Sequence, residues 1–296
     1  MAPSQGRLKL RSVGISGIRK PLTVLRGGRE NHLAVTFRVA VDLPSSRKGS
    51  DLSRNAEILA EVVDNTVTQP VESLESACST IARELLARHS YATEASVEAS
   101  AEYFLRRGVS EEKRSFEDYT LLAEARARRL PDGSIALERA VGAETVGMTA
   151  CPCAMETCRE ELMREFPHLR DPEFRDVPMI SHNQRNRTQL IFELDMTSEV
   201  EVDRMIEAIE AAQSSPTYAI LKRGDEGQVV LAAHRRPKFV EDVLRDLFAS
   251  LPSRFPDLPD STGVRVGTVS EESIHKYNAE ASHRLTLGEL RRPSGE

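Results

Sequence analysis

The feature that most constrains the fold is a regular alternation of apolar residues near the start of the chain. Single residues separate the apolar side chains of Leu33, Val35, Phe37, Val39, Val41 and Leu43. Because successive side chains of a β-strand point to opposite faces of a sheet, this period predicts a strand. One face of that strand is expected to be buried.

The segments after this strand predict two helices and then further strands. The helices are expected at residues 53–67 and 71–89, with Pro70 between them. The second carries an apolar stripe at helical spacing, formed by Val71, Leu74, Cys78, Ile81 and Leu85. Strands are expected at residues 91–107, 115–130 and 134–148.

The second half of the chain repeats this order of strand and helix. A strand is expected at residues 190–196. Ser198 and Glu201 then have the spacing of a capping box before a helix that starts near Val202. Further strands are expected at residues 218–222, 229–233 and 264–269, and a further helix at 238–251.

The repeated order predicts an α+β fold built from two tandem modules. Each module is expected to be an antiparallel sheet with helices on one face. Residues 1–150 form the first expected module and residues 151–296 the second.

Composition disfavours two classes of protein. The net charge of −6, and an aromatic content of 5% without Trp, argue against a nucleic-acid binder, which needs a basic face and stacking platforms. No apolar run reaches the roughly 18 residues of a membrane helix. The polar start MAPSQGRLKLRS lacks the apolar core of a secretory signal. A cytoplasmic location is therefore expected, where clustered thiols stay reduced.

The most specific local feature is a cluster of cysteines followed by a histidine motif. Cys151, Cys153 and Cys158 lie within eight positions, and the string SHNQR contains His182. A thiolate and an imidazole are good ligands for zinc or ferrous iron. A closed structural zinc site with all four residues, a redox pair of cysteines and a catalytic metal site remain open, because spacing does not decide among them.

Seven motifs, in order, carry a resemblance that covers nearly the whole chain. They are VGISGIRKPL (13–22), RKGSDLSRNAE (47–57), VGMTACPCAMET (146–157), SHNQR (181–185), YAILKRGDE (218–226), RPKFVEDVLRD (236–246) and ESIHKYNA (272–279). This set resembles the motifs of the bacterial type IB GTP cyclohydrolases and of their archaeal counterpart in methanopterin synthesis. The long insertion between Cys151 and His182 resembles the archaeal branch.

The resemblance implies a fold, an assembly and a metal. Members have two tandem tunnelling-fold modules, form a barrel-like homotetramer and build their active sites where subunits meet. By position, Cys151, His182 and Glu226 match the metal ligands. One divalent metal per subunit is then expected, with Fe²⁺, Zn²⁺ or Mn²⁺ as candidates. Such a metal activates a water molecule for attack on C8 of GTP, and the second module carries most of this site.

The resemblance also implies residues that bind the substrate. Glu241 matches the glutamate that anchors the purine, since a carboxylate can accept two hydrogen bonds from N1–H and the 2-amino group of guanine. Arg54, Arg185 and Lys222 are candidates for the triphosphate, by charge and neighbourhood.

Two catalytic positions match the family, and two depart from it. Glu272 matches an acid beside the metal, and His275 matches a proton shuttle. Asp51 and Tyr277 stand where the family usually has histidines. Their reference pKa values of about 3.9 and about 10 lie far from neutrality.

These features predict an enzyme that hydrolyses GTP at C8, releases formate and gives a dihydroneopterin-type product for pterin or folate synthesis. One alternative is a hydrolase that stops at a formamidopyrimidine or uses another purine nucleotide. The other is a tunnelling-fold protein that binds a nucleotide without turning it over.

Overall fold

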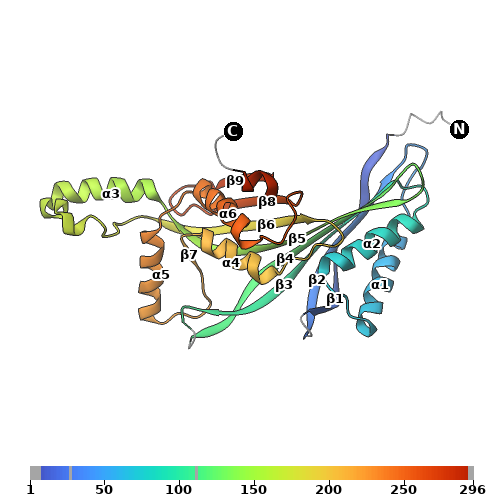
Figure 1. Cartoon of the computed structure of the whole chain (residues 1–296), viewed down its shortest axis with the longest axis horizontal. Helices are drawn as coiled ribbons and strands as arrows, with labels where there is room; N and C mark the ends of the chain where they lie inside the picture. Colours follow the sequence, from blue (N-terminus) through green and yellow to red (C-terminus); the bar gives the residue numbers. More distant parts are fainter. Residues whose placement is uncertain (1–7, 27–28, 111–112, 293–296) are drawn as a thin grey trace. The chain divides into compact units, whose positions relative to one another are not determined.

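The computed structural model describes residues 8–26, 29–110 and 113–292 (Figure 1). The first seven residues of the polar N-terminal stretch lie outside this range. Within the described residues, no helix is both long enough and apolar enough to cross a membrane.

Contacts divide the chain into two compact units. The N-terminal unit contains Met1–Tyr103, Thr120–Gly142 and Phe192–Val200. The C-terminal unit contains Phe104–Tyr119, Ala143–Ile191 and Glu201–Glu296.

Strands and helices follow one another in an order that occurs twice. The first series is β1 (Leu10–Arg26), β2 (Arg29–Leu43), α1 (Leu52–Thr68), α2 (Leu74–Arg88), β3 (Glu94–Gly108) and β4 (Arg114–Arg129). The second is β5 (Ile135–Ala150), β6 (Asn183–Leu194), α4 (Val202–Ala212), α6 (Val240–Arg254), β8 (Gly263–Ser270) and β9 (Ala279–Thr286). Additional elements are α3 (Pro152–Glu165), η1 (Pro167–Arg170), η2 (Pro172–Phe174), β7 (Ser215–Pro216), α5 (Arg223–Arg235) and α7 (Leu287–Arg291).

The described strands are hydrogen-bonded in the order β1-β2-β3-β4-β5-β6-β8-β9, and β7 pairs with β5. In the N-terminal unit, β2 pairs antiparallel with β1 and β3, in a register that places Leu22 opposite Leu33 and Val39 opposite Val97. In the C-terminal unit, β8 and β9 form an antiparallel pair. The expected antiparallel sheet with helices is therefore confirmed.

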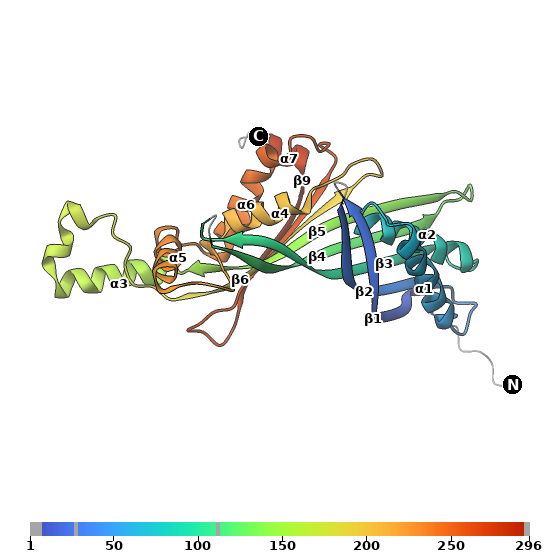
Figure 2. The ribbon, with the colours of Figure 1, turned by 90° about the horizontal axis from the view of Figure 1, so that it is seen from below.

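The core of the N-terminal unit follows the alternation in the sequence. Val35 and Val39 are fully buried in β2, where β-strand geometry turns them to one face. Helix α1 packs on β1, helix α2 packs on β2, and the two helices also contact each other (Figure 2). Cys78 lies on the buried side of α2, where desolvation raises the pKa of its thiol, so this cysteine belongs to the core.

The core of the C-terminal unit lies where helices α4 and α6 pack together. Helix α6 also contacts β8, β9 and α7. Met205 and Ile209 of α4 and Leu247 of α6 are fully buried, as the apolar stripes of an amphipathic helix require.

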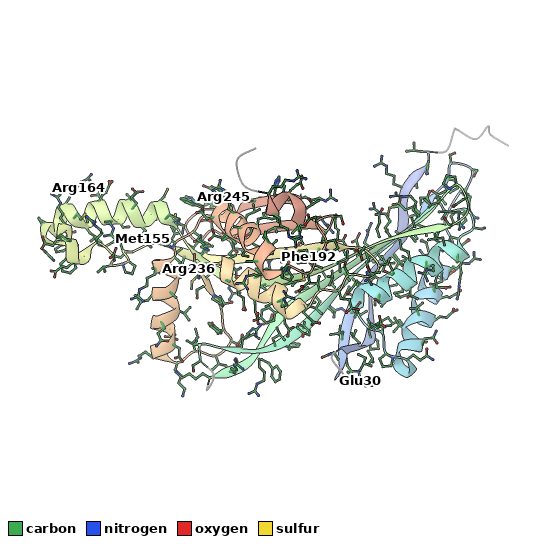
Figure 3. The ribbon with its side chains drawn as sticks, viewed as in Figure 1. Glu30, Met155, Arg164, Phe192, Arg236 and Arg245 are labelled. Carbon is green, nitrogen blue, oxygen red and sulfur yellow. The ribbon has the colours of Figure 1, made fainter. Side chains whose placement is uncertain are left out.

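Helix α3 starts directly after Cys151 and contains Cys153 and Cys158, and the chain then turns back through η1 and η2. Met155 near its start is buried, whereas Arg164 near its end pairs with Glu161 (Figure 3). Arg159 donates hydrogen bonds to the carbonyls of Phe174 and Val177, which hold the returning segment against the helix.

Two strands expected from the sequence are wrong. Residues 217–222 have no regular structure, and residues 229–233 belong to α5. The apolar run from Val229 is helical because Val229 and Ala233 lie four residues apart on one buried side, while the residues between them face outward.

The expected capping box at Ser198 is also wrong. Helix α4 starts after Glu201, without a capping bond from a side chain. The carboxylate of Asp195 instead accepts the backbone N–H groups of Thr197 and Ser198. Ser198 therefore belongs to a turn closed by an aspartate.

Candidate active site

The cysteine and histidine motifs meet through their backbones at the ends of two neighbouring strands. Cys151 directly follows β5 and precedes Pro152, the first residue of α3. Its N–H donates to the carbonyl of His182 over 3.1 Å, and the Ser181 hydroxyl donates to the carbonyl of Cys151 over 2.5 Å. Two motifs about thirty positions apart in sequence are thus held side by side.

The ring of His182 is almost enclosed, with 11% of its side chain exposed. Its Nδ1 lies 2.9 Å from Oε1 of Gln184 and 3.4 Å from the Ser273 hydroxyl. The carboxylate of Glu272 lies 3.9 Å from the same nitrogen and accepts a hydrogen bond of 3.3 Å from Nε2 of Gln184. The structure therefore brings His182 and Glu272 together, as the motifs predict.

His275 and Tyr277 extend this cluster along the segment between β8 and β9. The rings of His182 and His275 meet edge to face, with 6.3 Å between their centroids. Tyr277 stacks on His275 and is 63% exposed. The Glu272 carboxylate and the His275 imidazole thus lie next to His182, and the Tyr277 phenol lies against His275. Groups of these types can move protons.

The segment that carries Lys222 and Glu226 is held by two acidic residues. Asp225 accepts a hydrogen bond from the backbone N–H of Lys222 and forms a 2.6 Å ion pair with Lys113. The hydrogen bond from Lys113 holds the pKa of Asp225 below its usual value. Glu117, which is buried, accepts the N–H of Ala219 over 2.8 Å. These bonds fix where α5 begins.

Glu226 lies in the first turn of α5 and is exposed. Among the residues that the structure describes, no three His, Cys, Asp or Glu side chains gather as a group that could hold a metal ion. The predicted ligands Cys151, His182 and Glu226 are therefore not assembled as a set within one chain, and their role stays a prediction.

Glu241 lies in the first turn of α6 with its side chain exposed. The start of this helix is fixed against the end of α4, because Arg236 (Figure 3) and Lys238 donate to the carbonyls of Ala211 and Ala212. Arg185, on β6, is also exposed, and its carbonyl accepts the N–H of Glu271 over 2.8 Å.

Asp51 and Arg54 belong to the N-terminal unit. The Asp51 carboxylate lies 3.4 Å from the guanidinium of Arg47 and 3.5 Å from that of Arg54. Asp51 therefore forms ion pairs with two arginines that flank it in the same motif.

A buried network that the sequence reasoning missed supports this motif. His89 is fully buried between Asn55, 2.7 Å from its Nε2, and the Tyr91 hydroxyl, 2.9 Å from its Nδ1. Burial lowers the pKa of His89, because the charged form of the ring loses its hydration. The Tyr91 hydroxyl also forms a hydrogen bond with the Ser50 hydroxyl, and the guanidinium of Arg47 lies over the ring of Tyr91. No periodic pattern in the sequence signals such a network.

Gln184, Ser273 and Glu117 were also missed as members of the site. A signal for Gln184 exists, because uncharged polar residues alternate with arginines along β6. Gln184, Asn186 and Thr188 are buried, while Arg185 and Arg187 are exposed. This alternation indicates a strand whose inward face is polar.

Comparison with known protein families and relatives gives consistent matches. The sequence profile of the family described as type I GTP cyclohydrolase folE2 matches residues 2–281. GTP cyclohydrolase MptA of Methanococcoides burtonii is 39% identical over 292 residues, which cover 96% of this chain and 92% of that protein. The MptA of Methanosarcina acetivorans is 40% identical over 294 residues, with the same coverage of 96% and 92%.

Uricases are among the solved structures with a similar fold. Uricase from Arthrobacter globiformis aligns with a TM-score of 0.58 and 8% identity, covering 99% of this chain and 97% of that one. A uricase from Bacillus fastidious aligns with a TM-score of 0.58 and 10% identity, covering 95% and 94%. At such low identity the likeness shows the fold alone, which is of the tunnelling type.

Proposed function

Since the chain belongs to the type I GTP cyclohydrolase folE2 family and is therefore a hydrolase that acts on GTP, we propose that it opens the guanine imidazole ring at C8. The products we propose are formate and a dihydroneopterin-type compound. Family membership agrees with the resemblance seen in the motifs, and it does not support the alternative of a protein that only binds a nucleotide.

One observation carries this proposal. His182, Glu272, His275 and Tyr277 come from two separate motifs and form one cluster next to Cys151. Ring opening requires a proton to leave the attacking water and a proton to reach the ring nitrogen that is released. Glu272 and His275, which both lie next to His182, are the two groups that can supply these transfers.

We further propose that Cys151, His182 and Glu226 hold one divalent metal per subunit. The donor atoms are one sulfur, one nitrogen and one oxygen, a set that suits Fe²⁺, Zn²⁺ or Mn²⁺. Within the described residues, no hydrogen bond occupies Nε2 of His182, which leaves this atom available as a ligand. When bound, the metal would lower the pKa of a water molecule so that hydroxide forms near neutral pH.

The position of Glu226 supports a site completed by a second copy of the chain. Its side chain is exposed, so it is available to a site on a neighbouring subunit. We therefore propose a homotetramer of barrel-like form with shared active sites. The two modules divided at residue 150 and the cytoplasmic location stay predictions.

The proposed substrate contacts use exposed side chains. Glu241 would pair with the N1–H and 2-amino groups of guanine, which adenine does not offer in the same arrangement. Arg54, Arg185 and Lys222 would bind the triphosphate, and all three are exposed, as a site for a highly charged ligand requires.

A specific observation favours a second candidate, a hydrolase that stops at the formamidopyrimidine. Asp51 is engaged by Arg47 and Arg54, and Tyr277 is stacked on His275. Neither residue has the imidazole that the motif match leads us to expect at its position. The steps after ring opening are therefore the ones we expect to be slowed.

The test is anaerobic incubation of metal-loaded protein with GTP, with formate, ultraviolet absorbance and pterin fluorescence followed together. Formate released in proportion to the GTP consumed, with a dihydropterin product, supports the main proposal. Loss of the guanine absorbance without formate supports the formamidopyrimidine product. Unchanged GTP with every candidate metal overturns both.

A further inference from the structure

A buried chain of polar side chains leads from His182 into the C-terminal unit. Its members are uncharged and come from β5, β6, β8 and the end of α4. They are Gln184, Thr149, Ser270, Asn186, Thr268, Thr188 and Gln213. Burying a polar group without a hydrogen bond costs free energy, so most groups of such a chain are expected to be hydrogen-bonded.

Asn186 occupies the centre of this chain and uses both ends of its amide. Its Nδ2 donates to the hydroxyls of Thr268 over 2.9 Å and Ser270 over 3.1 Å. Its Oδ1 accepts from Thr188 over 2.7 Å and from Gln213 over 3.0 Å. Four bonds of matched polarity leave the amide one orientation, which makes this part of the chain rigid.

The rigid part reaches Gln184 through two hydroxyl groups. Ser270 and Thr149 lie 3.3 Å apart, and the Thr149 hydroxyl accepts a hydrogen bond of 3.1 Å from Nε2 of Gln184. The same Nε2 donates to Oε1 of Glu272 over 3.3 Å. The Gln184 side chain is thus held from two sides.

The contacts of Gln184 show which way its amide points. Its NH₂ group faces the Glu272 carboxylate and the Thr149 hydroxyl, because Nε2 donates to both. The Gln184 oxygen then faces Nδ1 of His182, 2.9 Å away. An amide oxygen only accepts, so Nδ1 of His182 carries the proton. In the neutral ring, the free electron pair is then on Nε2.

Distances identify Gln184, and not Glu272, as the partner of His182. The Glu272 carboxylate lies 3.9 Å from Nδ1, beyond the range of a hydrogen bond. Ser273, at 3.4 Å, is at the limit of that range. The 2.9 Å contact to Gln184 is the short one.

We propose that Gln184 is a positioning residue of the GTP site, which leaves Nε2 as the free nitrogen of His182 and holds the Glu272 carboxylate on the Nδ1 side of the ring. The inference rests on the proposed function, because it takes His182 as a metal ligand. Groups that hydrogen-bond the far nitrogen of a ligating histidine fix its tautomer and orientation, and their loss typically lowers metal affinity by about 10–100-fold.

The first experiment needs neither metal nor a variant of Gln184. Solid-state NMR of metal-free protein labelled with ¹⁵N-histidine distinguishes the protonated from the unprotonated ring nitrogen, and His182→Phe identifies the signals of His182 by their loss. We expect the proton on Nδ1. A proton on Nε2 of the neutral ring overturns the proposal.

The second experiment compares Gln184→Met with Thr149→Val. Methionine has a similar length but accepts and donates no comparable hydrogen bond, so the preference for Nδ1–H should be lost and Fe²⁺ or Zn²⁺ affinity should fall about 10–100-fold. Thr149→Val removes a neighbour of Gln184 but keeps the bonds of Gln184 to His182 and Glu272. It should preserve the tautomer and most of the affinity.

Two results of this comparison overturn the proposal: an unchanged tautomer and affinity in Gln184→Met, or an equal loss of affinity in Thr149→Val. If the wild-type protein binds none of these metals, the proposed metal site fails. The tautomer of His182 in the wild-type protein still decides the role of Gln184 in that case.

Discussion

The rings of His275 and Tyr277 stack, with their centroids 4.9 Å apart and their planes inclined by 9°. By the motif match, a second histidine is expected at the position of Tyr277, so this expected substitution lies in contact with His275. The phenol ring limits the orientations open to His275. This contact gives Tyr277 a role that does not require its hydroxyl to exchange a proton.

Two substitutions of Tyr277 distinguish the effect of its ring from the effect of its hydroxyl. Aromatic pairs contribute about 0.5–1.5 kcal/mol beyond the burial of area, so we expect Tyr277→Ala to lower kcat for ring opening by up to about tenfold. Tyr277→Phe keeps the stacking and should lower kcat less. Initial rates of GTP loss measure both, and an equal loss in the two variants would show that the hydroxyl itself acts.

Metal content should depend on Cys151 and not on Cys158. The backbone N–H of Cys151 donates a hydrogen bond to the carbonyl of His182, whereas Cys158 lies about two helical turns after Cys151, in α3. We expect about one divalent metal per subunit in the wild-type protein, most of it lost in Cys151→Ala and retained in Cys158→Ala. Elemental analysis measures this content, and equal loss in the two variants would favour a closed structural zinc site.

Stability in acid should depend on the ion pair of Lys113 with Asp225. The hydrogen bond from Lys113 holds the pKa of Asp225 below 3.8 in the folded protein. A carboxyl with a lowered folded pKa stabilises fully above its unfolded pKa and loses that contribution as pH falls through the folded value. Lys113→Met should therefore melt at a lower temperature than the wild type at pH 6, and the gap should shrink below about pH 4.

The control for this measurement is Lys48→Met, which removes an exposed lysine of the N-terminal unit. Its melting temperature should follow the wild type across the same pH range. A gap between Lys113→Met and the wild type that is independent of pH would show that Lys113 stabilises by packing alone.

Elements with a strong apolar periodicity could be predicted from the sequence. An element whose first turn is held by contacts with distant residues could not. The alternation around Val35 and Val39 gave β2 correctly, because a buried face imposes a period of two. The run Val229–Ala233 suits a strand by composition, yet it is helical. Helix α5 begins just before this run, where Asp225 is held by Lys113. Lys113 is more than a hundred positions away from Asp225 in the sequence, so this contact is not visible in the local pattern.

The motifs indicated candidate site residues, but the partners of those residues could not be predicted from the sequence. The meeting of His182 with Glu272 and His275 agrees with the motif assignments. Gln184 lies in the same motif as His182, but it was not among the predicted site residues. The predicted residues are metal ligands, proton carriers or charged groups, and the glutamine side chain is none of these. One of its hydrogen-bond partners is Thr149, which becomes a neighbour only through strand pairing.

Glu241 should select guanine over adenine. A site built to pair with one purine edge leaves polar groups unpaired when that edge changes, and well-formed sites of this kind discriminate by a factor on the order of 10⁴. We expect Glu241→Gln to lower kcat/KM for GTP by at least about a hundredfold and to weaken this preference. The control is Glu160→Gln, which changes an exposed carboxylate on α3. Comparable turnover of ATP and GTP by the wild-type protein would remove Glu241 from this role.

The two departures from the family should limit the later steps of the reaction. Deformylation, rearrangement of the ribose and closure of the pterin ring each require proton transfers near neutral pH. Asp51 forms ion pairs with Arg47 and Arg54, and Tyr277 is an exposed phenol. We therefore expect the wild-type protein to open the purine ring but to form little fluorescent pterin.

The double variant Asp51→His and Tyr277→His should raise the fraction of opened substrate that becomes pterin, because it restores two groups that titrate near pH 7. The matched control is Asp51→Asn with Tyr277→Phe, which releases the two arginines and removes the phenol hydroxyl without adding an imidazole. Pterin fluorescence per mole of GTP consumed measures the effect. An equal increase in the control would assign it to the freed arginines, and rapid, complete conversion of GTP to a dihydropterin by the wild-type protein would show that Asp51 and Tyr277 sustain the full reaction in place of the two histidines.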